Sequence, residues 1–358
     1  CWWLVLVLTF LLASLLGCAG PAVDSNRIND LAPLRLDDTA IVASDAASTV
    51  PQVDLLALDP TMREFVARYT ANEPSSHTRL MSLHQALRGA GGLNMQYDPF
   101  AEGTAREVFY RAEANCLSYA NLFIAMAREA GLDARYQWVE VRPQWSRVSN
   151  RVQVGLHVNV AVRLPGGKRY MVDIDPLPSR YLSGSKELTD EEGAALYYNN
   201  IAMAALADGD KARSWSYLVR ALQLSPSDAH LWANLGALYR SAGQHSEAER
   251  SYLQALELDF TEYSAMTNLA ILYGLEGRDE EQQYWLHRAV TPRRKNPYHH
   301  AWQGDEAATG GVWSAALAHY DRALDLAPGD SHLLFSRGVT YYQLADYDAA
   351  VANIEKAI

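Results

Sequence analysis

Hydrophobic residues follow three different patterns along the 358-residue chain. Residues 2–16 form one apolar run that only two polar residues interrupt. Between residues 53 and 190, helical patterns come first and alternating, strand-like patterns follow. From residue 191 onwards the spacing of hydrophobic residues is helical throughout. These patterns predict an α+β domain at 53–190 and an all-α domain at 191–358.

The α+β region contains one strongly apolar helical pattern, which starts after Asn115 and ends at Gly131. Its apolar residues recur at helical spacing: Leu117, Ala120, Leu122, Phe123, Met126 and Ala127. Cys116 belongs to the first helical turn, where unpaired backbone N–H groups and the positive end of the helix dipole favour a thiolate. The position suits a nucleophile, although a small buried residue that begins a core helix is the commoner explanation of a lone cysteine.

Two strand patterns after this helix carry the groups that a thiol nucleophile requires. Residues 151–164 alternate strictly, with valines and leucines on one face and His157 on the other. A proline–glycine turn leads to a second strand at 168–175, which is expected to pair back as a hairpin with Asp173 and Asp175 on one face. A histidine base and a carboxylate that orients it complete the set of groups that activates a thiol.

In order, element type and spacing from histidine to aspartate, these segments resemble the transglutaminase-like superfamily of papain-type cysteine enzymes. The resemblance covers about residues 54–188. It implies that Cys116 attacks an acyl carbon and that His157 acts as general base and then as general acid. It also implies that Asp173 holds the imidazole in its productive tautomer.

Three details of the resemblance stay open. Many members have a tryptophan two residues after the histidine, where this chain has Asn159. Asp175, which precedes a proline, also looks like the family's aspartate–proline ending, although the spacing favours Asp173. The Cys116 backbone N–H is expected to stabilise the oxyanion of the reaction. The candidates for a side-chain donor beside it are Gln96, Tyr97 and Asn115.

From residue 191 onwards the helical patterns repeat every 34 residues. The repeats begin at Ala195, Ala229, Tyr263, Pro297 and Ser331. One repeat position holds only small residues, namely Ala202, Gly236, Ala270, Gly304 and Gly338. The pattern resembles tetratricopeptide repeats, in which small residues let paired helices approach closely. The resemblance implies a solenoid of five repeats whose concave face binds a protein or peptide. Tyr198, Asn234 and Asn268 are candidates for that face, and a packing or neutral position is an equal alternative for each of them.

The apolar run at 2–16 is too short for a membrane-spanning helix and has the length of a signal-peptide core. It ends in Leu15-Leu16-Gly17-Cys18, which resembles the lipobox of bacterial lipoproteins. The resemblance implies that residues 1–17 are removed and that Cys18 is lipidated. Residues 18–52 are rich in Ala, Asp, Ser, Pro and Val, which predicts a flexible tether.

Both ends of the sequence are expected to be incomplete. The apolar run lacks an initiator methionine and preceding basic residues, and the fifth repeat stops at Ile358 inside its second helix. Ala19 follows the predicted lipidated cysteine. By resemblance to Gram-negative sorting signals, that residue favours the bacterial outer membrane, facing the periplasm.

Composition removes several classes of partner. Cys1 goes with the signal segment and Cys18 takes the lipid, so Cys116 remains as the single thiol and no intramolecular disulfide is expected. A net charge of −11 argues against nucleic acid as a partner. The histidines lack metal-ligand spacing and no phosphate-binding glycine motif occurs, so neither a metal nor a cofactor is expected.

The sequence therefore predicts an exported, lipid-anchored cysteine enzyme that acts on an amide bond, as a peptidase or an acyltransferase. The repeats would recruit the protein or peptide partner. The alternative is a scaffold lipoprotein without catalytic activity, in which both domains only bind other proteins.

Overall fold

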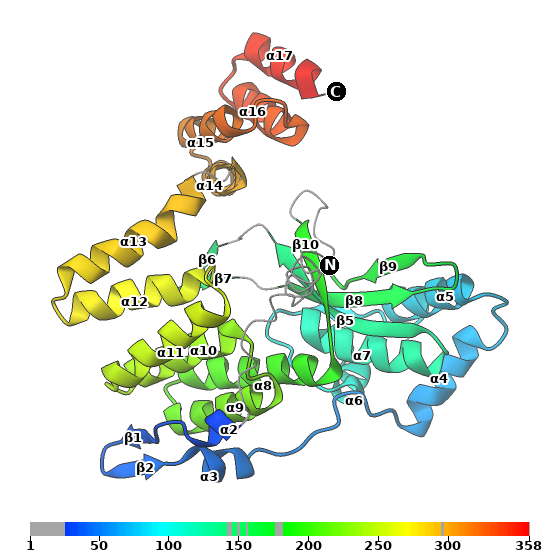
Figure 1. Ribbon diagram of the computed structural model, residues 1–358. Coiled ribbons are helices and arrows are strands. Elements are labelled where there is room, and N and C mark those ends of the chain that lie inside the picture. Colours follow the sequence, from blue (N-terminus) through cyan, green and yellow to red (C-terminus); the bar gives the residue numbers. More distant parts are fainter. Residues whose placement is uncertain are drawn as a thin grey trace, which may run out of the picture. The chain divides into compact units, whose positions relative to one another are not determined.

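The computed structural model describes residues 26–141, 145–148, 151–154, 157–175, 182–294 and 297–357 (Figure 1). The predicted signal segment 1–17 and the predicted lipidation site Cys18 lie outside the described residues. The chain divides into two compact units. The first comprises Cys1–Gln52 and Ala194–Leu272, and the second comprises Val53–Gly193 and Tyr273–Ile358. Among the described residues, no helix combines the length and the apolar character that crossing a bilayer requires.

Three helices and two short strands lead to the central helix of the α+β domain. They are α4 (Pro60–Thr70), α5 (Ser76–Arg88), β3 (Gln96–Tyr97), α6 (Ala105–Arg111) and β4 (Glu113–Ala114). The central helix is α7 (Cys116–Glu129), which follows β4 after a single residue. The strands β3 and β4 pair in parallel, with Tyr97 opposite Ala114. This short pair brings Tyr97 next to the start of the central helix.

Local hydrogen bonds explain where α7 begins and ends. The Asn115 side chain accepts a hydrogen bond from the Ser118 backbone N–H at 2.8 Å, and the Ser118 hydroxyl accepts one from the Asn115 N–H at 3.0 Å. This capping box satisfies two donors at the helix start. Gly131, with a φ of +75°, adopts the left-handed conformation that commonly ends a helix. Every residue from Leu117 to Ala127 is buried, so α7 forms the core of the domain.

A four-stranded antiparallel sheet contacts α7, with its strands in the order β10–β5–β8–β9. The strands are β5 (Asp133–Val141), β8 (His157–Arg163), β9 (Arg169–Val172) and β10 (Leu182–Leu188). Val160 of β8 is fully buried and pairs with Tyr136 of β5. The Tyr136 hydroxyl donates a hydrogen bond to Asn121 of α7 at 2.7 Å. The valine face predicted from the alternation is therefore the face that packs against α7.

The single strand predicted at 151–164 is in fact two strands. The first, β7 (Arg151–Val154), pairs with β6 (Trp145–Val148) in a separate hairpin. The second, β8, starts at His157 and belongs to the four-stranded sheet. The prediction of one strand was wrong because both halves alternate with the same period of two, which does not reveal a change of partner.

Helices α8 to α17 form the all-α part of the described chain. Their bounds are α8 (Asp190–Ala207), α9 (Lys211–Leu224), α10 (Ala229–Ser241), α11 (His245–Leu258), α12 (Tyr263–Leu275), α13 (Asp279–Arg294), α14 (Pro297–Thr309), α15 (Trp313–Leu326), α16 (Ser331–Gln343) and α17 (Tyr347–Ala357). A Cβ atom on Gly236 of α10 would lie 2.4 Å from the Tyr252 ring of α11. One on Gly304 of α14 would lie 2.7 Å from the Tyr320 ring of α15. The small residues therefore allow the close helix pairing for which they were predicted.

The segment predicted as a flexible tether is folded from Asn26 onwards. Its elements are α2 (Asn26–Asn29), β1 (Leu34–Leu36), β2 (Thr39–Ile41) and α3 (Ala43–Ser48). Leu34 is fully buried. The Gln244 side chain accepts a hydrogen bond from the Arg35 backbone N–H at 2.7 Å and donates one to the Pro33 carbonyl at 3.1 Å. The composition did not indicate this packing, because the few residues that anchor the segment are widely spaced.

One of the three candidates for the concave face of the repeats is buried. Tyr198 is 3% exposed, and its hydroxyl donates a hydrogen bond to the Pro51 carbonyl at 3.1 Å. Asn234 and Asn268 are half-buried, and Asn234 donates a hydrogen bond to Asn199 at 2.8 Å. Of the two alternatives for Tyr198, the structure supports a packing position, because the N-terminal segment folds against the first unit's repeats.

An ion pair joins the two ends of the second repeat, with Nδ1 of His230 and Oε2 of Glu262 2.5 Å apart. Burial alone lowers the pKa of His230 and raises the pKa of Glu262. Their mutual hydrogen bond and charges outweigh burial, so the pKa of His230 lies above its usual 6.5 and the pKa of Glu262 below its usual 4.5. The histidine stabilises the fold below pH 6.5 and loses this effect as the pH rises through its raised pKa. The glutamate stabilises it above pH 4.5 and loses this effect as the pH falls through its lowered pKa.

Replacing Glu262 by glutamine is therefore expected to destabilise the protein most between pH 4.5 and 6.5. The expected loss is about 1–3 kcal/mol, between the values typical of exposed and buried pairs. It is measured by urea denaturation of the full chain across the pH range. Glu281→Gln, which breaks the exposed pair of Glu281 with Arg278, is the control and should show no change between pH 6.5 and 9. A Glu262→Gln effect that stays constant up to pH 9 would contradict the prediction.

Candidate active site

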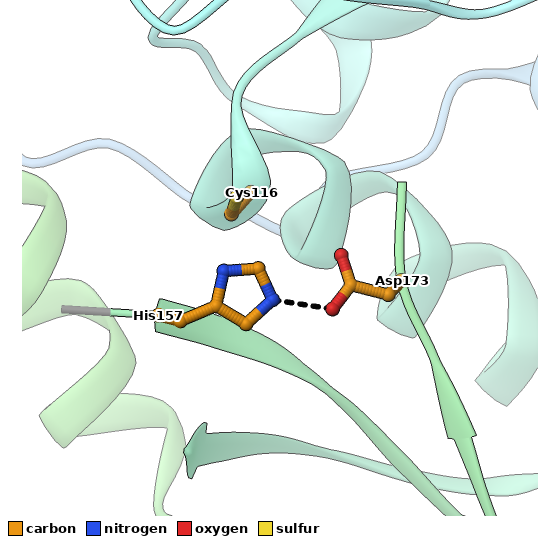
Figure 2. A group of neighbouring side chains, drawn as sticks. All are labelled: Cys116, His157 and Asp173. Atoms are coloured by element: carbon orange, nitrogen blue, oxygen red, sulfur yellow. Dashed lines mark hydrogen bonds and ion pairs between the residues drawn. The ribbon is translucent and has the colours of Figure 1, made fainter. Parts of the chain in front are cut away.

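Three predicted site residues from separate parts of the chain meet at one point (Figure 2). The Cys116 sulfur, a ring nitrogen of His157 and a carboxylate oxygen of Asp173 all lie within 4.8 Å of one another. Nε2 of His157 is hydrogen-bonded to Oδ2 of Asp173. Figure 2 shows the other ring nitrogen facing Cys116. The imidazole therefore lies between a thiol and a carboxylate.

Each of these side chains lies at the end of a regular element. Cys116 is the first residue of α7, so its backbone N–H has no partner within the helix. His157 is the first residue of β8, and β9 ends at Val172, directly before Asp173. Because β8 and β9 are antiparallel neighbours, the start of β8 lies beside the end of β9. This pairing brings together two residues that are 16 positions apart in the sequence.

Asp173, and not Asp175, contacts the histidine. The side chains of His157 and Asp173 are only 9% and 5% exposed, whereas Asp175 is an exposed residue. The backbone N–H of Asp175 donates a hydrogen bond to Oδ1 of Asp173 at 3.1 Å. The geometry thus agrees with the spacing in the sequence, and Asp175 supports Asp173 through its backbone.

The charges around His157 keep its ring protonated. Burial by itself lowers the pKa of His157, because it penalises the charged ring. The hydrogen bonds and negative charges of Asp173 and Cys116 outweigh burial and raise the pKa of His157 to about 10. A protonated imidazole opposite a sulfur is the charge distribution found where a histidine activates a cysteine nucleophile.

The three candidate oxyanion donors have different surroundings. The Asn115 side chain caps α7 and donates a hydrogen bond to Glu102 at 2.7 Å. Gln96 donates its amide hydrogen to a neighbouring backbone carbonyl at 2.7 Å. The Tyr97 hydroxyl lies beside the Cys116 sulfur, and burial together with the charge of Cys116 raises the pKa of Tyr97. Tyr97 is therefore the candidate whose hydroxyl reaches the sulfur.

Two contacts, one to Asp173 and one to the residue after it, were not expected from the sequence. The side-chain amide of Asn159 donates a hydrogen bond to Oδ2 of Asp173 at 3.3 Å. Arg88 of α5 donates one to the backbone carbonyl of Ile174, directly after Asp173. The alternation of residues 151–164 places Asn159 on the same face as His157, so its position was visible in the sequence. Its partner was not, because that partner lies on another strand.

Within the described part of the chain, these residues are also the one group of three that could bind a metal ion. Zinc is bound by thiolate, imidazole and carboxylate ligands of this kind. In a metal site the ligand atoms point at the ion. Here the ring nitrogen of His157 and the carboxylate oxygen of Asp173 are hydrogen-bonded to each other. This contact favours a catalytic arrangement over a metal site.

Comparison with known families supports the predicted family of the α+β domain. The model of the transglutaminase-like superfamily matches residues 63–176, which include Cys116, His157 and Asp173. Residues 63–176 are a transglutaminase-like domain. Two tetratricopeptide repeat models match residues 229–262 and 303–358. The predicted fold class, an α+β transglutaminase-like domain followed by tetratricopeptide repeats, is thereby confirmed.

Three proteins similar to this chain each cover less than half of its length. The photosystem I assembly protein Ycf3 of Rippkaea orientalis (strain PCC 8801 / RF-1) is 25% identical over 140 residues, which are 38% of this chain and 69% of Ycf3. Anaphase-promoting complex subunit 3 of Schizosaccharomyces pombe (strain 972 / ATCC 24843) is 23% identical over 137 residues, or 38% of this chain and 21% of that protein. The solved structure of MamA from Desulfovibrio magneticus RS-1 is 16% identical, covers 47% of this chain and 94% of its own, and has a TM-score of 0.27. These likenesses assign no function to the transglutaminase-like domain.

Proposed function

We propose that this protein is a cysteine-dependent enzyme that acts on an amide bond of a protein or peptide. The observation that carries the proposal is the hydrogen bond of His157 to Asp173 opposite Cys116, inside a transglutaminase-like domain. All three side chains are of the types that nucleophilic acyl transfer requires. The contact of His157 with Asp173 opposite Cys116 favours an enzyme over a domain that only binds other proteins.

In the proposed reaction the Cys116 sulfur attacks the carbonyl carbon of the amide, while His157 holds the proton that left the thiol. The backbone N–H of Cys116 and the Tyr97 hydroxyl stabilise the negative charge on the carbonyl oxygen. His157 then gives its proton to the amine nitrogen as the C–N bond breaks, and a thioester remains on Cys116. A water molecule or an amine next loses a proton to His157 and attacks the thioester, which releases the acyl product and restores the thiol.

The proposed role of the repeats is to recruit the protein or peptide partner through their concave face. Stacked repeat helices bury one side and leave such a face open. Asn234 and Asn268 occupy the same position in consecutive repeats and keep part of their surface accessible. Amide groups at regular spacing are suited to hydrogen bonding with the backbone of an extended chain.

The proposed location is the bacterial cell envelope, with a lipid on Cys18 anchoring the chain to the outer membrane, facing the periplasm. The support is the lipobox-like sequence before Cys18. The first described helix begins at Asn26, and the chain from Cys18 to that residue can span at most about 30 Å. A lipid on Cys18 would therefore keep the first unit close to the membrane surface.

The proposed chemistry is tested with p-nitrophenyl acetate as a small acyl donor. The native chain is expected to release p-nitrophenol in a burst equal to the amount of protein and to gain one acetyl group on Cys116, detected by mass spectrometry. Cys116→Ala is expected to show neither. Glycinamide added to the reaction separates the two outcomes, because an acyltransferase forms acetylglycinamide and a hydrolase forms acetate.

A chelator provides the control for the alternative use of the same side chains. EDTA is expected to leave the burst unchanged, because the proposed reaction uses the hydrogen-bonded His157 and Asp173 and no metal. A folded native chain that forms no acyl-enzyme would overturn the proposal. That result would favour a scaffold in which both domains only bind proteins.

A further inference from the structure

Asp173 accepts hydrogen bonds from three donors. Two of these donors lie outside the predicted catalytic triad of Cys116, His157 and Asp173. Nε2 of His157 and Nδ2 of Asn159 both reach Oδ2, the second at 3.3 Å. The backbone N–H of Asp175 reaches Oδ1 at 3.1 Å. Each of these contacts restricts the rotation of the carboxylate.

Asn159 makes its contact in a position that is unfavourable for an amide. The residue is 2% exposed, and its Oδ1 has no hydrogen-bond partner among the described residues. A buried amide oxygen without a partner is destabilising, and an apolar side chain of similar size would avoid this loss. Stability therefore does not explain an asparagine here. The contact of its Nδ2 with Asp173 explains why the residue is an asparagine.

Gln137 provides a comparison on the same face of the sheet. It lies on β5 directly opposite Asn159 in the strand register, and it is 6% exposed. Its side-chain amide contacts the sulfur of Met171 at 3.8 Å. Two buried amides thus lie on adjacent strands in similar surroundings, and the contact to Asp173 is made by Asn159.

We propose that Asn159 is a positioning residue, which holds Asp173 so that Oδ2 faces His157. It acts through Asp173 and does not touch the acyl group. The inference rests on the proposed function, since Asp173 serves catalysis only where Cys116 and His157 react. At the position where many transglutaminase-like proteins have a tryptophan, this chain therefore has a hydrogen-bond donor to the catalytic aspartate.

Replacing Asn159 by alanine in the full chain is expected to slow the p-nitrophenyl acetate burst about ten- to hundredfold. Gln137→Ala is the matched control and should change the rate by less than about twofold. In an Asp173→Ala background, Asn159→Ala is expected to have no further effect, because the residue that it positions is gone. An equal loss in both backgrounds, or an equal loss in Gln137→Ala, would indicate a general effect on packing and overturn the proposal.

Asn159→Asp tests whether the donor is what matters, because aspartate has nearly the same shape. An ionised carboxylate at this position repels Asp173, whereas a protonated one donates a hydrogen bond to it. The rate of Asn159→Asp relative to the native chain is therefore expected to rise as the pH falls and the two carboxylates take up a shared proton. A ratio that does not change with pH would count against the proposal.

Titration of His157 by NMR separates this inference from the proposed function, because it requires no turnover. Asn159→Ala is expected to lower the pKa of His157 from about 10, and Gln137→Ala is expected to leave it in place. If no acyl-enzyme forms but the titration shifts, the proposed function fails and the positioning role stands. If the native chain is acylated and neither rate nor titration responds to Asn159→Ala, the positioning role alone fails.

Discussion

Replacing His157 by alanine is expected to slow the acylation of Cys116 about a thousandfold near neutral pH. The protonated ring lies between the sulfur and Asp173, so its removal takes away both the acceptor of the thiol proton and the positive charge that faces the sulfur. The rate is measured from the p-nitrophenol burst of the full chain. Cys116→Ala gives the background that does not depend on the thiol.

A second histidine of the same domain supplies the control for this substitution. His84 on α5 packs against the Phe123 ring, and burial and the charge of Arg88 lower the pKa of His84. His84→Ala therefore removes a largely buried imidazole from the core without removing the base, and the rate should change by less than about threefold. If His157→Ala is folded and acylates as fast as the native chain, His157 is not the base and the proposed mechanism is wrong.

Replacing Asp173 by alanine is expected to lower the same rate by about 10²- to 10³-fold, whereas Asp175→Ala should lower it by less than about threefold. Asp173 is the residue whose carboxylate holds Nε2 of His157 and thereby directs the other ring nitrogen towards Cys116. Asp175 contributes its backbone N–H, which alanine retains. The two variants thus decide between the two aspartates that the sequence pattern left open.

Asp173→Asn divides the contribution of the aspartate into two parts. The asparagine oxygen can still accept a hydrogen bond from His157, so the ring stays oriented, but the negative charge beside it is lost. The rate of Asp173→Asn is expected to lie between those of the native chain and Asp173→Ala. Equal losses in Asp173→Ala and Asp175→Ala, with both proteins folded, would show that neither side chain orients the histidine as the structure indicates.

The repeat region and the central helix were predictable from sequence because their signals are local. Helices α10, α12, α14 and α16 begin at the first residues of predicted repeats two to five. In each helix the hydrophobic spacing and the small residues reflect packing against the neighbouring helix. Because this pattern recurs every 34 residues, one repeat predicts where the helices of the next repeat begin. The start of α7 was equally predictable from sequence, since the Asn115 cap and Cys116 are adjacent in the chain.

The residues of the triad were predictable from the sequence, whereas the pairing of the strands that position them was less predictable. Alternation identified the face that carries His157, and the spacing favoured Asp173. The sequence analysis predicted one strand at 151–164 and missed its division into β7 and β8. A period-two pattern predicts a strand but does not indicate which strand it pairs with. The same limitation hid the contact of Asn159 with Asp173, which depends on how β8 and β9 pair.

Sequence alone determined the two kinds of domain, the start of α7, the starts of α10, α12, α14 and α16, and Cys116, His157 and Asp173 as candidates for one site. These features follow from periodicity and from caps, which act over a few neighbouring residues. Tertiary structure alone decided that residues 26–52 fold against the repeats, that these residues bury Tyr198, and that the Tyr97 hydroxyl lies beside the Cys116 sulfur. Each of these depends on contacts between segments distant in the chain, whose energy comes from burial and hydrogen bonds that no local pattern records.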